Sequence, residues 1–144
     1  MKTDVVIRQF DEARDRTSVV TLWHQVFGYG APHNHPEFSI GKKLKVNDGL
    51  FFVAECDGEV IGTVMAGYDG HRGWIYSLAV KPEARSRGTG RQLILHAETA
   101  LAKVGCIKVN LQVIEDNKGV VDFYRKAGYT VEPRISMGKL LNKP

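Results

Sequence analysis

The chain has 144 residues, of which 43% are hydrophobic and 25% are charged, the composition of an ordinary globular protein. This length fits one domain over residues 1–144, and no segment has the apolar run of a signal peptide or a membrane span. The net charge of +4 is dispersed among acidic residues, so we expect neither a nucleic-acid partner nor a membrane partner.

The use of cysteine favours a reducing compartment. Cys56 and Cys106 are isolated in the sequence and form neither a Cys-x-x-Cys pair nor an evident disulfide framework. Because disulfides persist mainly in oxidising compartments, two isolated thiols predict a cytoplasmic location.

The first half of the chain predicts strands and helices in alternation. Glycine and proline residues break the chain at 28–36, and Asp57-Gly58 is a strong signal for a hairpin turn. The predicted elements are a strand at 5–10, a helix that presents Val19, Leu22, Trp23, Val26 and Phe27 on one face, a helix at 37–46, and strands at 50–56 and 59–68.

The most informative segment follows a strand predicted at 74–80. Gly88 and Gly90 let the backbone approach a ligand closely, and the helix that begins here presents unpaired N–H groups. The helix dipole and the guanidinium groups of Arg85, Arg87 and Arg91 favour an anion at this place. The segment, which predicts a site for a phosphate-bearing ligand, reads Val80-Lys81-Pro82-Glu83-Ala84-Arg85-Ser86-Arg87-Gly88-Thr89-Gly90.

Two other phosphate motifs do not fit this segment. A P-loop requires Lys followed by Ser or Thr after its glycines, and no such pair follows here. A dinucleotide-binding turn requires a third glycine, and only Gly88 and Gly90 are present. The plainer alternative is an ordinary turn that caps a surface helix.

The remainder of the chain predicts two more helices. Val120, Phe123, Tyr124 and Ala127 recur at helical spacing. Asn117 is a favourable N-cap before them, and Gly128 suits the position after the helix end. The predicted elements are a helix at 90–104 ended by Gly105, a strand at 107–114, a helix at 118–127 and two short terminal strands.

Two motifs carry a resemblance to a known family. Arg-x-x-Gly-x-Gly after a strand that ends at Val80 resembles the coenzyme A pyrophosphate loop of the GNAT N-acetyltransferases. The pattern Asn117…Phe123-Tyr124…Gly128-Tyr129 is similar to the second signature of that family, at the expected distance after the first. The resemblance runs from about residue 52 to 129. It implies an α/β fold, with a mixed central sheet that holds a splayed pair of parallel strands and is flanked by helices.

The resemblance also implies an activity and a site. It implies transfer of an acetyl group from acetyl-CoA, as co-substrate, to a primary amine of a small molecule, a protein N-terminus or a lysine, by direct attack in a ternary complex. A backbone N–H near Leu78 would polarise the thioester carbonyl, and Tyr124 stands at the position of the family's tyrosine acid. The implied coenzyme A-binding residues are Leu78, Ala79, Val80, Arg85, Ser86, Arg87, Gly88, Thr89, Gly90, Arg91, Asn117, Phe123, Tyr124 and Lys126.

The general base is where the sequence departs from the family pattern. Many members place a glutamate on the strand that corresponds to 74–80, but this strand has no carboxylate, and the facing strand offers Gln112. The base therefore stays open. The candidates are Tyr76, Ser77, Asp69, His71, Glu115 and Asp116, with water-mediated deprotonation as an alternative.

The loop between the first two helices carries a further set of polar and aromatic residues. His33, His35 and Glu37 could be read as metal ligands, but no cysteine or second carboxylate cluster supports them, so we predict no metal. In the family this loop covers the acceptor site, which implies that Phe27, Tyr29, His33, His35 and Glu37 line the entry for the amine.

Two other functions stay open at this point. The missing carboxylate base is compatible with a binding module or sensor that holds acyl-CoA without turnover. The basic loop could instead serve another polyanion. A homodimer is possible for either enzyme or sensor.

Overall fold

The computed structural model describes residues 4–28, 35–115 and 117–142. Its contacts group the chain into two compact units, Met1–Leu111 and Gln112–Pro144. The first unit contains a five-stranded sheet with helices α1, α2 and α3, and the second contains helix α4. No helix in the described part of the chain combines the length and the apolar character needed to cross a membrane.

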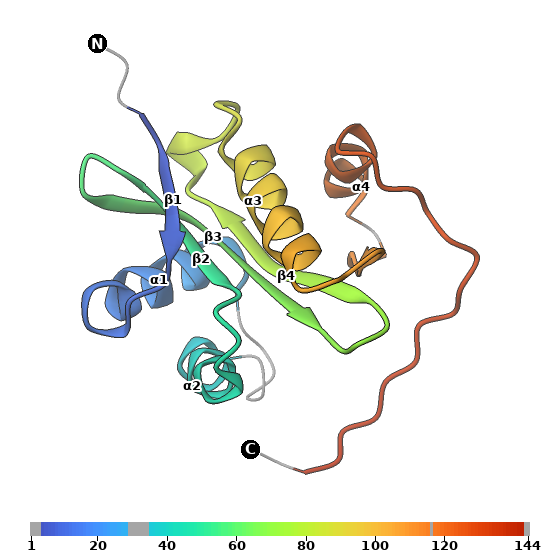
Figure 1. The fold of residues 1–144 in the computed structure, drawn as a ribbon. Coiled ribbons are helices and arrows are strands. Elements are labelled where there is room, and N and C mark those ends of the chain that lie inside the picture. The colour runs from blue at the N-terminus through green and yellow to red at the C-terminus, as the bar shows by residue number, and fades with distance from the viewer. Residues whose placement is uncertain (1–3, 29–34, 116, 143–144) are drawn as a thin grey trace. The chain divides into compact units, whose positions relative to one another are not determined.

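The sheet is mixed and runs in sequence order from β1 to β5 (Figure 1). The first four strands pair antiparallel, whereas β4 and β5 pair parallel. A parallel neighbour requires a crossover, which α3 supplies between β4 and β5. The mixed sheet of the predicted fold class is thereby confirmed. The strands are β1 (Val6–Gln9), β2 (Phe51–Cys56), β3 (Glu59–Tyr68), β4 (Gly73–Val80) and β5 (Val109–Leu111).

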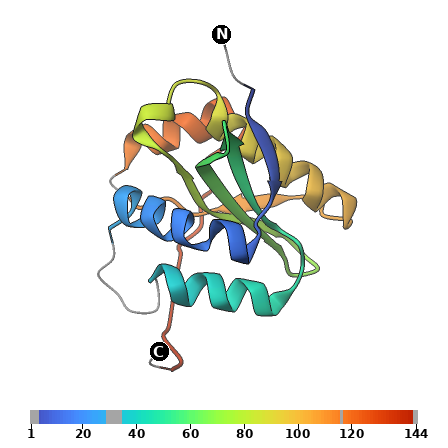
Figure 2. The same ribbon diagram turned by 90° about the vertical axis from the view of Figure 1, so that its left-hand side faces the viewer.

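Helices cover both faces of this sheet (Figure 2). Thr63 of β3 faces α1, where its side chain bonds to Trp23. A Cβ at the preceding residue, Gly62, would lie 3.0 Å from Leu93 of α3. Since successive strand residues point to opposite faces, α1 and α3 lie on opposite sides of the sheet. The helices are α1 (Glu12–Val26), α2 (Pro36–Val46), the 3-10 turn η2 (Pro82–Ala84) and α3 (Thr89–Lys103).

The main core lies between α1 and the sheet. Val19, Leu22 and Trp23 of the predicted apolar stripe are buried there, and the Trp23 ring stacks on Phe51 at 5.8 Å between centroids. Phe27 departs from the prediction, because it lies at the C-cap of α1 and its side chain is 42% exposed. The stripe was therefore right for the body of the helix and wrong for its last residue.

Local turn signals were reliable in both units. Asp57 and Gly58 both have positive φ, at 53° and 76°, which is the backbone of a tight hairpin turn between β2 and β3. In the second unit, α4 (Lys118–Lys126) begins after Asn117, whose side chain accepts the N–H of Val120 at 3.3 Å. Gly128 follows the helix with φ of 99°.

Strand ends in the last third of the chain were predicted less well. The strand expected at 107–114 is limited to Val109–Leu111, because its register with β4 ends at the pair Ile75 and Leu111. The two short terminal strands are wrong: none of the described residues after α4 is in a strand. Pro133 has no N–H to give to a ladder, and Ile135 and Met137 are each 91% exposed, so no apolar face is buried.

Candidate functional site

Among the described residues, no strand pairs with the outer edge of the last residues of β4, which is called the open edge below. β5 pairs with β4 only from Gly73 to Ile75, whereas β3 continues to pair with it up to Val80. The N–H of Lys81 donates to the carbonyl of Ile61 at 2.8 Å. Because antiparallel partners alternate in their bonding, Ala79 also bonds to β3, and the N–H and C=O groups of Leu78 and Val80 point to the open edge.

A β-bulge interrupts β4 just before this edge. Met65 pairs with Tyr76 and Thr63 pairs with Ala79, so one β3 residue opposes both Ser77 and Leu78. Ser77 has φ of 53°, in the left-handed region, where a residue with a Cβ is disfavoured by roughly 1–2 kcal/mol. Bulges of this kind re-aim the backbone, and they are frequent beside active sites.

A buried polar chain, which the sequence analysis missed, contacts the bulge. The indole Nε1–H of Trp23 donates to Oγ1 of Thr63 at 2.8 Å, and that hydroxyl donates to the carbonyl oxygen of Ser77 at 2.9 Å. The available signal was a single hydroxyl residue, Thr63, within the apolar run at 60–66. The bulge itself has no sequence signal here, because positive φ usually selects glycine.

The loop after β4 leads into α3 without a side-chain cap. Gly88 is the N-cap, with φ of 81°, and the first turn of α3 contains no acidic residue. The helix ladder begins with the N–H of Gln92, which donates to the Gly88 carbonyl at 3.0 Å. The amides of Thr89 and Gly90 thus precede the ladder, and the buried Thr89 hydroxyl has no hydrogen-bond partner in the described chain. This helix start suits an external anion.

One arginine of the loop before α3 is bonded back to β4. The Nε–H of Arg85 donates to the carbonyl of Val80 at 3.2 Å, which ties the loop to the open edge of β4. Ser86 has φ of 66°, so the loop turns sharply before Arg87. The predicted residues that lie on consecutive segments of the first unit, from the end of β4 to the first turn of α3, are Leu78, Ala79, Val80, Arg85, Ser86, Arg87, Gly88, Thr89, Gly90 and Arg91.

The other four predicted site residues belong to α4 in the second unit. Asn117 is used as the N-cap, and Lys126 lies in the last turn. The rings of Phe123 and Tyr124 meet edge to face at 5.2 Å, and Tyr124 and Tyr129 do so at 5.8 Å. Burial raises the pKa of Tyr124 to about 12, so its phenol stays protonated at neutral pH.

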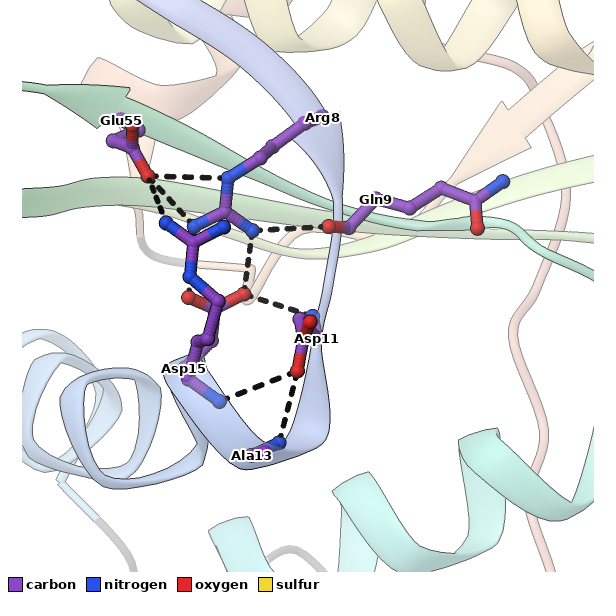
Figure 3. Close-up of polar contacts among 7 residues, drawn as sticks. Arg8, Gln9, Asp11, Ala13, Asp15 and Glu55 are labelled. Atoms are coloured by element: carbon purple, nitrogen blue, oxygen red, sulfur yellow. Dashed lines mark hydrogen bonds and ion pairs between the residues drawn. The ribbon is translucent and has the colours of Figure 1, made fainter. Parts of the chain in front are cut away.

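A second cluster of charged residues lies where β1 meets α1 (Figure 3). The guanidinium of Arg8 donates to both carboxylate oxygens of Asp15, at 2.7 and 2.9 Å, and to Glu55 at 2.8 Å. Asp11 caps α1 by accepting the N–H groups of Ala13 and Arg14. The anions that this helix start requires are thus supplied by the chain itself.

The electrostatics of Asp15 follow from this cluster. Burial alone raises the pKa of the Asp15 carboxyl, but the Arg8 hydrogen bonds, the Asp11 N–H and the charges of Arg8 and Arg14 outweigh burial. Together they hold the pKa below its usual range. The same carboxylate raises the pKa of Arg8. The bonds of this cluster connect β1, α1 and β2, so they stabilise the fold.

The candidates for the general base differ in what they contact. Asp69 accepts the N–H groups of Arg72 and His71 in the β3–β4 turn, and these bonds lower its pKa, which makes it a weaker base. Tyr76 is 42% exposed, and the Lys43 ammonium lies 5.6 Å from its ring centroid. Asp116 lies outside the described residues.

The residues predicted to line the acceptor entry are only partly described. Tyr29 and His33 lie outside the described residues. His35 is the N-cap residue of α2 and makes no side-chain cap bond, and Glu37 lies in the first turn of that helix. Phe27 presents its half-exposed ring at the end of α1.

Comparison with known proteins identifies relatives that match most of the chain. The model of the Acetyltransferase (GNAT) family matches residues 16–129. An acetyltransferase of Pectobacterium atrosepticum is 44% identical over 127 residues, which cover 88% of this chain and 89% of the relative.

Solved structures of two other proteins have a similar fold. The aminoglycoside N-acetyltransferase AAC(6')-Iy in complex with CoA matches with a TM-score of 0.79 and 21% identity, over 97% of each chain. The PaiA N-acetyltransferase of Thermoplasma acidophilum in complex with coenzyme A matches with a TM-score of 0.78 and 21% identity, over 92% of this chain and 93% of the other. At such identities the likeness concerns the fold.

Proposed function

The chain belongs to the GNAT acetyltransferase family and is an acetyl-CoA-dependent acyltransferase, and we propose that it acetylates a primary amine by direct attack in a ternary complex. The amine nitrogen attacks the thioester carbon, the C–S bond breaks, and coenzyme A leaves as a thiolate. One proton leaves the amine and one reaches the thiolate, so the products are an N-acetyl amine and the coenzyme A thiol.

One observation carries this proposal: the open edge of β4 leads directly into the uncapped start of α3. The outward backbone groups of Leu78 and the outward N–H of Val80 suit the amides of pantetheine, which would bind as a short strand. The glycine N-cap and the arginines that follow suit a pyrophosphate. A ligand that has both an amide arm and a pyrophosphate matches the two features in their order along the chain.

We assign the polarisation of the thioester to the backbone N–H of Leu78. Oxygen gains negative charge as the amine attacks, and a donor already aimed at it stabilises the transition state without reorganisation. The site also holds the amine and the thioester together, which supplies much of the rate advantage of a ternary complex.

For the departing thiolate we propose Tyr124, on the family pattern. Thiols have an ordinary pKa of about 8.5, well below the pKa of about 12 of this phenol. The phenol is therefore the weaker acid, and its contribution is a hydrogen bond to the sulfur, while solvent delivers the final proton. A neutral phenol can make this bond across the physiological pH range.

The acceptor amine is tested by an assay of thiol release. Purified protein is incubated with acetyl-CoA and a panel of amines that comprises an aminoglycoside, a polyamine, glucosamine 6-phosphate, a lysine peptide and a peptide with a free N-terminus. We expect release of coenzyme A thiol with one amine class and a matching N-acetyl product by mass spectrometry. Acetyl-CoA binding without product across the panel would favour an acyl-CoA sensor instead.

A further inference from the structure

The polar chain at the β4 bulge gives a role to two residues deep in the core. Trp23 and Thr63 are 1% and 0% exposed, and buried polar groups of this kind are nearly always hydrogen-bonded. Here the bonds run in one direction, from the Trp23 indole to the Thr63 hydroxyl and from there to the Ser77 carbonyl. This series of hydrogen bonds connects α1, through β3, to the backbone of β4.

The order of donors fixes the direction of the Thr63 hydroxyl. A hydroxyl has one proton and two lone pairs, whereas the indole N–H can only donate. The bond from Trp23 occupies a lone pair of Thr63, so the proton of Thr63 is directed to Ser77. Trp23 thus orients the bond that Thr63 makes to the bulge.

The bond to Ser77 also sets the direction of the next amide. The C=O of Ser77 and the N–H of Leu78 belong to one planar trans peptide, in which the two groups point in opposite directions. Thr63 holds the C=O of Ser77 toward its own hydroxyl, so the N–H of Leu78 points away from Thr63. The left-handed φ of Ser77 is disfavoured for a residue with a Cβ, so this orientation requires support.

We infer that Trp23 and Thr63 are positioning residues that aim the N–H of Leu78 at the thioester oxygen of acetyl-CoA. The inference rests on the proposed function, which supplies that oxygen. It goes further in assigning a catalytic consequence to two side chains that are buried in the core.

The direct test is infrared difference spectroscopy with [1-13C]acetyl-CoA bound to the protein. A hydrogen bond from the Leu78 N–H shifts the labelled carbonyl band to lower frequency than in solution. Thr63→Val keeps the size of the side chain and removes the hydroxyl, so most of this shift should be lost. Binding of acetyl-CoA, measured by calorimetry, should change little, because Thr63 is fully buried.

Two further variants separate positioning from packing. Thr63→Ser keeps the hydroxyl and should keep the shifted band. Trp23→Phe removes the bond that orients the hydroxyl, together with part of the buried ring volume, and should give an intermediate shift. With an acceptor amine from the panel, Thr63→Val should lower kcat by about 10- to 100-fold with little change in the KM for acetyl-CoA.

The chain contains only two tryptophans, which permits an independent readout. In a 1H–15N spectrum, Thr63→Val should move the indole resonance of Trp23. The resonance of Trp74, whose Nε1 is 3.4 Å from an Asp69 oxygen, should stay in place as an internal reference.

Each outcome decides the inference. A wild-type protein that does not bind acetyl-CoA overturns the proposed function and the inference with it. Normal binding with the same shifted band in wild type and Thr63→Val overturns the inference alone. If Thr63→Val does not fold, Trp23→Phe carries the test, and a band identical to wild type overturns the inference.

Discussion

Helices α1 and α3 are both 15 residues long, yet their N-termini are built in opposite ways. The start of α1 has an aspartate cap, acidic residues in its first turn, and the Arg8 guanidinium bonded to Asp15 (Figure 3). The start of α3 has a glycine cap, no side-chain cap and no acidic residue. Both regions contain arginines, so arginine content alone does not distinguish them.

The difference between the two helix N-termini indicates which of them is suited to bind a ligand. The positive end of α1 is neutralised by carboxylates of the chain itself, so its charges stabilise the fold. The positive end of α3 has no such anion in its first turn, and it follows directly on an open strand edge. A helix start that lacks internal anions is the one suited to bind an external one.

The largest effect is expected from Gly88→Glu, which tests whether the start of α3 binds acetyl-CoA. The substitution adds a Cβ and a negative charge at the cap of α3, so the Kd for acetyl-CoA should rise by at least about 100-fold, roughly 2.7 kcal/mol. Calorimetric titration measures the change. Gly70→Glu is a matched control, because Gly70 also has positive φ and open space around it but lies in the β3–β4 turn. Equal binding by both variants would refute the loop assignment.

A paired substitution of arginines tests the two helix starts against each other. Arg8→Met leaves the Asp15 carboxylate buried without its main partner and should lower the free energy of unfolding by about 2 kcal/mol, with the Kd for acetyl-CoA unchanged. Arg87→Met should change stability by less than about 0.5 kcal/mol. Arg87→Met should instead raise the Kd for acetyl-CoA. Urea unfolding measures the free energy of unfolding of each variant, and calorimetry measures its Kd for acetyl-CoA. If Arg8→Met raised this Kd as much as Arg87→Met, it would be wrong to assign Arg8 to stability and Arg87 to ligand binding.

A substitution on α4 separates chemistry from the binding that α3 provides. Tyr124→Phe removes the hydrogen bond proposed for the thiolate, so kcat should fall about tenfold, while acetyl-CoA binding stays close to wild type. Tyr129→Phe, which changes the neighbouring ring in the same way, is the control and should leave kcat unchanged. An unaltered kcat in Tyr124→Phe would remove that residue from the reaction.

The smallest effect concerns the pH dependence of the α1 cluster. The pKa of Asp15 is held below its unfolded value, so its contribution to stability is present above about pH 4 and is lost as pH falls through the folded pKa. The difference in unfolding free energy between wild type and Asp15→Asn should therefore narrow on acidification. Urea midpoints from about pH 6 down to about pH 2.5 measure it. A difference that is constant with pH would contradict the account.

The sequence predicted features that depend on local chemistry. The start of α3, the Asp57-Gly58 turn and the Asn117 cap each depend on a few adjacent residues with defined backbone preferences. The segments Leu78–Val80 and Arg85–Arg91 were predicted as neighbours because the loop connects them directly. Their role in binding coenzyme A stays a prediction until it is measured.

Features that depend on distant pairing could not be predicted in this way. The length of β5 and the absence of terminal strands in the described residues depend on which partner each segment meets. The bulge depends on a one-residue shift between β3 and β4, and Ser77 carries no local signal for its positive φ. Thr63 stood out only as one polar residue in an apolar run, and its partners come from α1 and β4.

The most direct test of the central claim is thermal unfolding of the wild-type protein with acetyl-CoA, coenzyme A, ATP and NAD in parallel. A ligand at about 100 times its Kd adds roughly 2.7 kcal/mol to the stability of the folded state. If the start of α3 and the edge of β4 together bind coenzyme A, both coenzyme A species should raise Tm, while ATP and NAD should not. Absence of a shift with acetyl-CoA, or equal shifts with all four ligands, would contradict the claim.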